Sequence, residues 1–337
     1  MPDRVSVVIP TRDRLGFLQE AVASIRKQSY PHWELIVVDD ASTDGTWAWL
    51  QTLENERIRA VRMEKHSERC VARNRGLEAA TGRSVLFLDD DDRLASDALG
   101  RLAVPLARKP RAVACIGARL IFNGAGRTRR VPHPRVSFAA DAWSDLLFGW
   151  SPVPGQCLIV RDGLHDVGGW NESLRAAEDL ELWLRLMRGG PVICVPAPVL
   201  ENRFHEGQRR PAEGAGFNRQ LREEAVSRLG EGEQRVAERI LHARDARRDA
   251  LAAFEEGRFA AALRGYAAAC RSYPRLLVSP IWGPYLLARI LKSGFACIGG
   301  GATMRRLQSA KGALRARRGR GSMGNKDIET AHRELRR

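Results

Sequence analysis

Four consecutive carboxylates, Asp89, Asp90, Asp91 and Asp92, directly follow the apolar run 85–88. Such a run is typical of a parallel strand that is buried on both faces. The acids then lie at the carboxyl end of that strand, where open α/β sheets bind their ligands. Adjacent carboxylates repel one another, and a divalent cation shared with a substrate's phosphates relieves that repulsion. A solvated acidic loop that begins the next helix is the alternative interpretation.

Other polar residues follow apolar runs in the same way. Asp39 and Asp40 come after 35–38, and Thr11 and Arg12 come after 5–10. Because parallel strands end at one edge of a sheet, we expect these distant side chains to share a cleft. Arg73 lies on the predicted helix 69–80, which leads into the acidic strand. Carboxylates, arginines and a cation together suit a nucleoside diphosphate, since acids bind base or ribose while cation and arginines bind phosphates.

The elements that would position these residues alternate between strand and helix up to about residue 112. The expected strands are 5–10, 35–38, 58–63 and 85–88, and the helix 13–28 has leucines and other aliphatics at helical spacing. This alternation predicts an α/β fold with a Rossmann-like, mostly parallel sheet flanked by helices. Beyond residue 112 we expect strands at 113–122, 156–160, 192–195 and 199–204, a helix at 178–187 and a mobile loop at 206–216.

Composition indicates an ordinary globular protein. The 337 residues are 44% hydrophobic and 28% charged, which suits one large domain and a smaller one. Six cysteines without CxxC spacing predict reduced core residues, not a disulfide framework or a zinc site. The chain has no apolar run of about 18 residues and no signal peptide, so we expect neither a transmembrane helix nor secretion, and predict a cytoplasmic protein.

The C-terminal third is predicted to be helical and basic. We expect domains at 1–218 and 219–304 followed by a basic tail at 305–337, with a helical hairpin at 236–272. The tail contains eleven Lys or Arg and three Asp or Glu, a net charge of +8. It suits peripheral contact with an anionic membrane at its inner face, and the aromatic residues Trp282, Tyr285 and Phe295 favour that over nucleic acid. A purely solubilising tail is the alternative.

Several ordered stretches resemble the family 2 glycosyltransferases. They are VSVVIPT at 5–11, VVDDASTDGT at 37–46, ARNRG at 72–76, FLDDDD at 87–92, and VGGWNE at 167–172 followed by EDLELW at 178–183. The resemblance covers about residues 4–205. It implies a glycosyltransferase A-type fold and an inverting transfer of a sugar from a nucleotide diphosphate sugar, with UDP as the expected carrier. The acceptor would be a hydroxyl of a saccharide or a lipid-linked intermediate in cell-surface polysaccharide or glycolipid synthesis.

The resemblance also implies a role for each matching residue. Asp179 matches the catalytic base, and a carboxylate close to the acceptor hydroxyl could take its proton. Asp91 and His205 match ligands of Mg²⁺ or Mn²⁺, with Asp92 as a substitute. Glu178 and Trp170 would border the acceptor. The nucleotide-sugar site would comprise Pro10, Thr11, Arg12, Asp39, Asp40, Arg73, Asp89 and Asp90.

Less specific interpretations stay open for these residues. Asp179 could instead cap its helix, and Glu178 could be the base if the register shifts. Trp170 could be a core residue, and His205 could be structural. For the whole protein, the alternatives are a non-catalytic nucleotide-sugar-binding scaffold and a nucleotidyltransferase. The second lacks support because the sequence has no glycine-rich, lysine-bearing triphosphate loop near its start.

Overall fold

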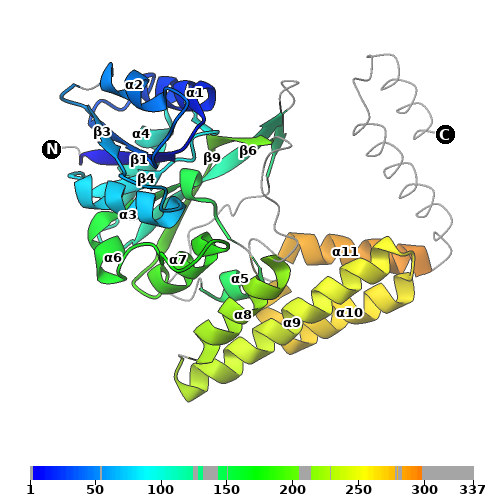
Figure 1. Ribbon diagram of the computed structural model, residues 1–337. Coiled ribbons are helices and arrows are strands. Elements are labelled where there is room, and N and C mark those ends of the chain that lie inside the picture. The colour runs from blue at the N-terminus through cyan, green and yellow to red at the C-terminus, as the bar shows by residue number, and fades with distance from the viewer. Residues whose placement is uncertain are drawn as a thin grey trace, which may run out of the picture. The chain divides into compact units, whose positions relative to one another are not determined.

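The chain folds into two compact units. Unit 1 extends from Met1 to Ala237, and unit 2 from Glu238 to Arg337. The computed structural model describes residues 3–53, 55–123, 128–131, 143–149, 151–204, 214–227, 229–277, 279 and 283–297. Unit 1 contains a sheet with flanking helices, and the described part of unit 2 is helical (Figure 1). The predicted basic tail at 305–337 lies outside the described residues.

Unit 1 is organised around a nine-stranded mixed sheet with the strand order β3-β2-β1-β4-β8-β6-β9-β5, in which β7 pairs with β6. The strands are β1 Val5–Thr11, β2 Trp33–Asp39, β3 Ile58–Arg62, β4 Ser84–Phe87, β5 Arg93–Leu94, β6 Ala114–Asn123, β7 Thr128–Arg130, β8 Cys157–Val160 and β9 Val192–Phe204. The pairs β3-β2, β2-β1 and β1-β4 are parallel, whereas β4-β8 and β8-β6 are antiparallel. The predicted α/β class is confirmed: the four strands β1 to β4 pair in parallel, and β6 and β9 form a further parallel pair.

Helices cover both faces of the parallel half. The helices of unit 1 are α1 Leu15–Arg26, α2 Thr46–Gln51, α3 Arg69–Ala79, α4 Ala98–Ala107, α5 Trp143–Phe148, α6 Arg161–Asp166, α7 Glu178–Leu186 and α8 Gly214–Ser227, with the 3-10 turn η1 Pro154–Gln156. The main core packs α1 and α4 against the face of β1 that carries Val5, Val7 and Ile9. On the opposite face, α3 approaches so closely that a Cβ at Gly76 would lie 2.2 Å from Val8 Cγ1. The parallel strand ends are therefore held in a fixed arrangement.

The structure differs from two of the expectations for the residues beyond 112. Residues 192–195 and 199–204 belong to one strand, β9, because a register shift against β6 near Gly117 and Ala118 accommodates the two prolines of β9. Within the expected loop 206–216, the helix α8 already begins at Gly214. Residues 205–213, including His205, lie outside the described residues. Helix α8 continues through residues 218 and 219 and belongs to unit 1.

Unit 2 confirms the predicted helical hairpin. Helix α9 Glu231–Glu255 enters it from unit 1, and α10 Phe259–Ser272 follows after a turn at Gly257, whose φ is 78°. The 3-10 turn η2 Pro274–Leu277 and the helix α11 Gly283–Phe295 complete the described part. Among the described residues, no helix combines the length and apolar character that crossing a bilayer requires. The six cysteines are free thiols.

Candidate active site

A cleft of about 490 Å³ lies at the carboxyl ends of β1, β2 and β4. Its lining residues are Pro10, Thr11, Arg12, Arg14, Asp40, His66, Glu68, Arg69, Ala72, Asp89, Asp90 and Asp91. Parallel pairing explains this gathering, because the register that aligns Thr11 with Asp39 brings the residues after both strands to the same edge. The structure thus brings together six of the eight residues expected to bind the nucleotide sugar, along with Asp91.

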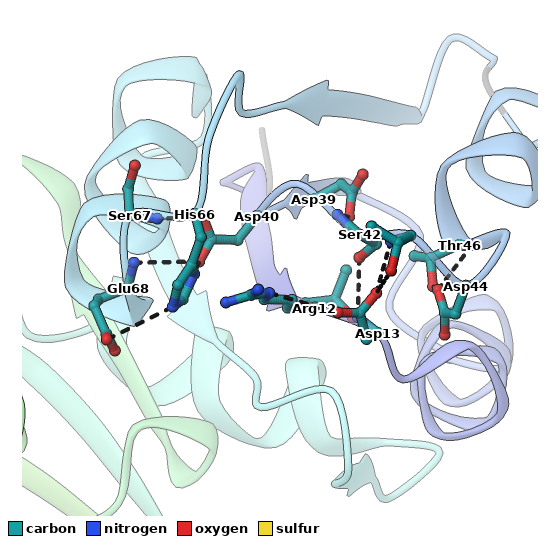
Figure 2. Close-up of polar contacts among 12 residues, drawn as sticks. Arg12, Asp13, Asp39, Asp40, Ser42, Asp44, Thr46, His66, Ser67 and Glu68 are labelled. Carbon is teal, nitrogen blue, oxygen red and sulfur yellow. Dashed lines mark hydrogen bonds and ion pairs between the residues drawn. The ribbon is translucent and has the colours of Figure 1, made fainter.

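Asp40 is a fixed acceptor in this cleft (Figure 2). One of its carboxylate oxygens, Oδ2, lies 2.7 Å from His66 Nδ1 and accepts a hydrogen bond from the Glu68 backbone N–H at 3.2 Å. The other, Oδ1, accepts one from the Ser67 backbone N–H at 2.7 Å. These partners come from the loop that follows β3, whose carboxyl end meets the same sheet edge. They set the direction of the Asp40 carboxylate.

The loops after β1 and β2 are joined by side chains (Figure 2). Asp13 Oδ1 accepts from the Thr43 backbone N–H at 2.6 Å, and the Asp13 backbone N–H donates to Ser42 Oγ at 3.0 Å. Asp39 is fully buried and its Oδ1 accepts from the Ser42 backbone N–H at 3.1 Å. We expected Asp39 to contact the nucleotide, but the structure places it within the protein, where it holds the turn that follows β2.

Backbone strain is concentrated around the cleft. The described non-glycine residues with positive φ are Asp13, Ala41, Glu68 and Ala177. Asp13 and Ala41 belong to the two joined loops, Glu68 lines the cleft, and Ala177 precedes α7. Glu68 has φ 74° and ψ 163°, a region that non-glycine residues rarely occupy. Such conformations cost about 1–3 kcal/mol each and cluster at functional sites.

Asp90, Asp91 and Asp92 each accept hydrogen bonds from other segments of unit 1. Asp90 accepts from Thr11 Oγ1 at 2.8 Å and from Arg14 Nη1 at 3.2 Å, and burial raises its pKa to about 6. Arg14 Nη1 also donates to Asp91 Oδ2 at 3.2 Å. Asp92 accepts from Asn202 Nδ2 at 3.0 Å and from the Arg203 backbone N–H at 2.7 Å, both on β9.

Asp89, Asp91 and Asp92 form a carboxylate cluster. One oxygen from each lies within 4.8 Å of the others. Burial, followed by the charges of Asp89 and Asp91, raises the pKa of Asp92 well above its ordinary value. A set of crowded oxygen ligands fits a hard divalent cation, which would relieve this repulsion. Asp89, expected in the nucleotide-sugar site, and Asp91, expected to bind the cation, thus share one cluster, while Asp90 is bonded to Thr11 and Arg14.

Comparison with known proteins identifies the family. The model described as Glycosyl transferase family 2 matches residues 6–165. TuaG of Bacillus subtilis (strain 168), named as a glycosyltransferase of teichuronic acid biosynthesis, is 35% identical over 190 residues, which cover 55% of this chain and 73% of TuaG. The chain belongs to glycosyltransferase family 2.

Two further comparisons concern parts of the glycosyltransferase and its fold. WfgD of Escherichia coli, named UDP-Glc:alpha-D-GlcNAc-diphosphoundecaprenol beta-1,3-glucosyltransferase, is 35% identical over 88 residues, 26% of this chain and 35% of WfgD. The crystal structure of Staphylococcus aureus TarS 1–349 in complex with UDP-GlcNAc superposes with a TM-score of 0.61 at 18% identity. It covers 86% of this chain and 89% of TarS 1–349, and shows that the glycosyltransferase A-type fold is shared.

Helix α7 of the glycosyltransferase begins with two carboxylates in different surroundings. Glu178 is buried and accepts from Arg69 Nη1 at 3.2 Å and Arg73 Nη1 at 3.3 Å. Asp179 is half-buried, and its Oδ1 accepts from the Leu180 backbone N–H at 2.7 Å. Burial, and then the charge of Glu178, raises the pKa of Asp179. Glu178 is therefore held by two cations, whereas the raised pKa of Asp179 suits a base.

Arg73 lies inside the glycosyltransferase and does not line the cleft. Its side chain is 2% exposed, and Nη2 donates to Asp89 at 2.7 Å. The guanidinium lies 4.4 Å from the centre of the Trp170 ring. Trp170, also 2% exposed, packs edge-on against Phe87 at 5.2 Å. The expected direct contacts of Arg73 with the nucleotide and of Trp170 with the acceptor are corrected accordingly, because both side chains are buried and Trp170 is a core residue.

Sequence reasoning missed four polar residues that line the cleft, Arg14, His66, Glu68 and Arg69, and the small residue Ala72. His66 and Glu68 follow the third parallel strand, so the rule that located Asp40 could have located them as well. Arg69 lies one helical turn before Arg73. Arg14 follows Thr11 by three residues in the loop after β1.

Proposed function

We propose that this glycosyltransferase inverts the anomeric centre as it moves a sugar from a UDP-sugar to an acceptor hydroxyl. The observation that carries the proposal is the cleft that is lined both by Asp40 with His66 and by the acids Asp89, Asp90 and Asp91. One end offers a carboxylate and an imidazole to a base, and the other offers acids and Arg14 to a ribose and a diphosphate. The UDP-GlcNAc bound by TarS and the UDP-Glc in the name of WfgD support UDP as the carrier.

Asp179 is the proposed catalytic base. In a direct displacement, the acceptor oxygen must lose a proton as it attacks the anomeric carbon, and a carboxylate can take that proton. The raised pKa of Asp179 increases its affinity for the proton at neutral pH. Glu178 is the weaker candidate, because its carboxylate is already engaged in ion pairs with Arg69 and Arg73. No covalent intermediate with the enzyme is required.

Mg²⁺ or Mn²⁺ is the proposed cofactor. Asp89 and Asp91 would hold it, with Asp92 as the third carboxylate of the cluster and His205 as a further proposed ligand. When bound, such a cation would neutralise the charge that develops on the departing diphosphate. Arg14 supplies positive charge of its own beside Asp90 and Asp91.

The proposed acceptor is a saccharide or a lipid-linked intermediate in cell-surface polysaccharide or glycolipid synthesis. Two names support this class: teichuronic acid biosynthesis for TuaG and a diphosphoundecaprenol-linked acceptor for WfgD. We propose that the reaction with such an acceptor takes place in the cytoplasm, at the inner face of the membrane. Glu178 would help to position the acceptor side of the site through its contacts with the two arginines.

A donor panel tests the proposal. Thermal unfolding would be followed with UDP, GDP, CDP and dTDP and their sugars, each with and without Mn²⁺. Binding raises the melting temperature, so we expect the largest shift with a UDP-sugar and Mn²⁺. Equal, negligible shifts with every nucleotide would refute the donor assignment.

A second experiment tests catalysis. Asp179→Asn should reduce release of UDP by about 10²–10⁴-fold while donor binding persists. Asp162→Asn is the matched control, because Asp162 is an exposed aspartate in the first turn of α6. Unchanged turnover in Asp179→Asn would reject Asp179 as the base. Donor binding without any turnover in the unmodified protein, across a panel of acceptors, would favour the scaffold alternative.

A further inference from the structure

Helix α11 presents apolar side chains to solvent. Leu287, Leu291 and Phe295 are 55%, 64% and 58% exposed. Their spacing of four residues places them along one stripe of the helix. The buried positions on the other side include Leu286 and Ser293. This is the reverse of an ordinary surface helix, whose apolar stripe faces the core.

The other face of α11 is already used for packing within unit 2. It contacts α10 and η2, and a Cβ at Gly283 would lie 2.3 Å from the Leu277 carbonyl oxygen. Arg289 lies over the Phe254 ring at 5.1 Å and the Tyr285 ring at 5.3 Å. Because these contacts fix the rotation of the helix, the stripe of Leu287, Leu291 and Phe295 remains outside the core of unit 2.

Charge indicates what covers this stripe. Lys292 is exposed at its edge, and residues 305–337, which begin ten positions after Phe295, have a net charge of +8. A second copy of the chain would bring an equal positive charge against the first, which opposes self-association. An apolar stripe beside a basic segment is instead typical of a helix that lies in the interface of an anionic bilayer.

We propose that Leu287, Leu291 and Phe295 insert into the boundary between headgroups and acyl chains of an anionic bilayer. The basic segment 305–337 supplies the electrostatic attraction. This binding surface adds to the proposed function and does not depend on the donor, the cation or the base. A single apolar stripe gives reversible binding, so both the stripe and the charge are needed for stable attachment.

Sedimentation of the full chain with lipid vesicles tests this surface. We expect binding to vesicles that contain phosphatidylglycerol and much weaker binding to phosphatidylcholine alone. The variant Leu287→Gln/Leu291→Gln should bind the anionic vesicles at least about tenfold more weakly, because both changes remove apolar area that the bilayer would cover. The control is Val104→Gln, since Val104 is 46% exposed on α4 of unit 1. It should bind as the unmodified protein does.

Three outcomes would overturn the proposal. The first is undiminished vesicle binding by Leu287→Gln/Leu291→Gln. The second is undiminished binding by a chain with neutralised tail residues, Arg315→Gln/Arg317→Gln/Arg318→Gln. The third is a dimer in light scattering that the stripe variant converts to a monomer, which would assign the stripe to a second copy. The shift in melting temperature on adding UDP should be the same in all variants. Failure of the donor assignment and failure of the proposed membrane-binding surface therefore give different results.

Discussion

Arg73 and Glu178 are 105 positions apart in the sequence, and Arg73 Nη1 donates to Glu178 Oε1 at 3.3 Å inside the protein. The same guanidinium donates to Asp89 at 2.7 Å. One buried arginine thus joins the start of the acidic run to the start of the helix that carries Asp179.

Removing this arginine should destabilise the fold. Arg73→Met removes a buried partner from Glu178, which keeps Arg69, and from Asp89, whose side chain is 42% exposed, so the cost should be at most about 3–5 kcal/mol, that of a broken buried pair. Arg75→Met is the control, since Arg75 forms an exposed ion pair with Glu78 on the same helix and should contribute at most about 1 kcal/mol. Urea unfolding measures both values. Equal effects of the two substitutions would show that the buried pair has no special role.

The fall of kcat/KM at acidic pH, the acid limb of the pH profile, should shift when Glu178 is replaced. Asp179 must be ionised to act as a base, so kcat/KM should fall as the pH drops through its pKa, which burial and Glu178 raise above 3.8. Glu178→Gln removes a negative neighbour, and the limb should therefore move to lower pH. Glu223→Gln, an exposed change on α8, should leave it in place. A limb that moves upward in Glu178→Gln would contradict this assignment.

Asp90 should make the ligand-free enzyme less stable at neutral pH. Its pKa is raised from 3.8 to about 6, so the folded state holds a proton that the unfolded chain has lost in that interval. The free energy of unfolding should decline between about pH 4 and pH 6, by an amount on the order of 3 kcal/mol from this group. Asp90→Asn should remove that decline and raise the melting temperature at pH 7. If its stability falls with pH as steeply as that of the unmodified enzyme, the decline comes from other groups.

The carboxylate cluster should bind Mn²⁺ or Mg²⁺. Adding Mn²⁺ at a hundred times its dissociation constant should stabilise the protein by about 2.7 kcal/mol, and a chelator should reverse the effect. Asp91→Asn should abolish the response. Asp97→Asn is the control, because Asp97 pairs with Arg101 on the surface. A full response in Asp91→Asn would place the cation elsewhere.

The sequence predicted the parallel half of the sheet and the residues at its edge because strand period and strand ends are local properties. It did not predict the burial of Arg73, although Cys70, Arg73 and Leu77 share the buried stripe of α3. The burial of an arginine on this stripe is explained only by its ion-pair partners, Asp89 and Glu178. Contacts between distant segments determine whether such a charged side chain is buried, and no local sequence pattern encodes those contacts.

The position of Asp92 likewise depends on a segment that is distant in the sequence. Its hydrogen bonds come from Asn202 and Arg203, 110 and 111 positions later. The hydrogen bond by which Asp39 holds its turn is local by comparison. The contacts of Asp13 with Ser42 and Thr43 cross only about one strand-helix unit. Strand alternation accordingly located the cleft, whereas the pairing of each acid required the complete sheet.

The acidic run is bounded by β4 in the middle of the sheet and by β5, which pairs with β9 more than 100 residues later. A ribosome that has added residues only up to 165, where the family match ends, has not yet made β9. The hydrogen bonds that hold Asp92 can therefore form only once residues 202 and 203 have been added, late in the synthesis of the chain. In a chain cut at residue 165, Asp92 has neither of these partners.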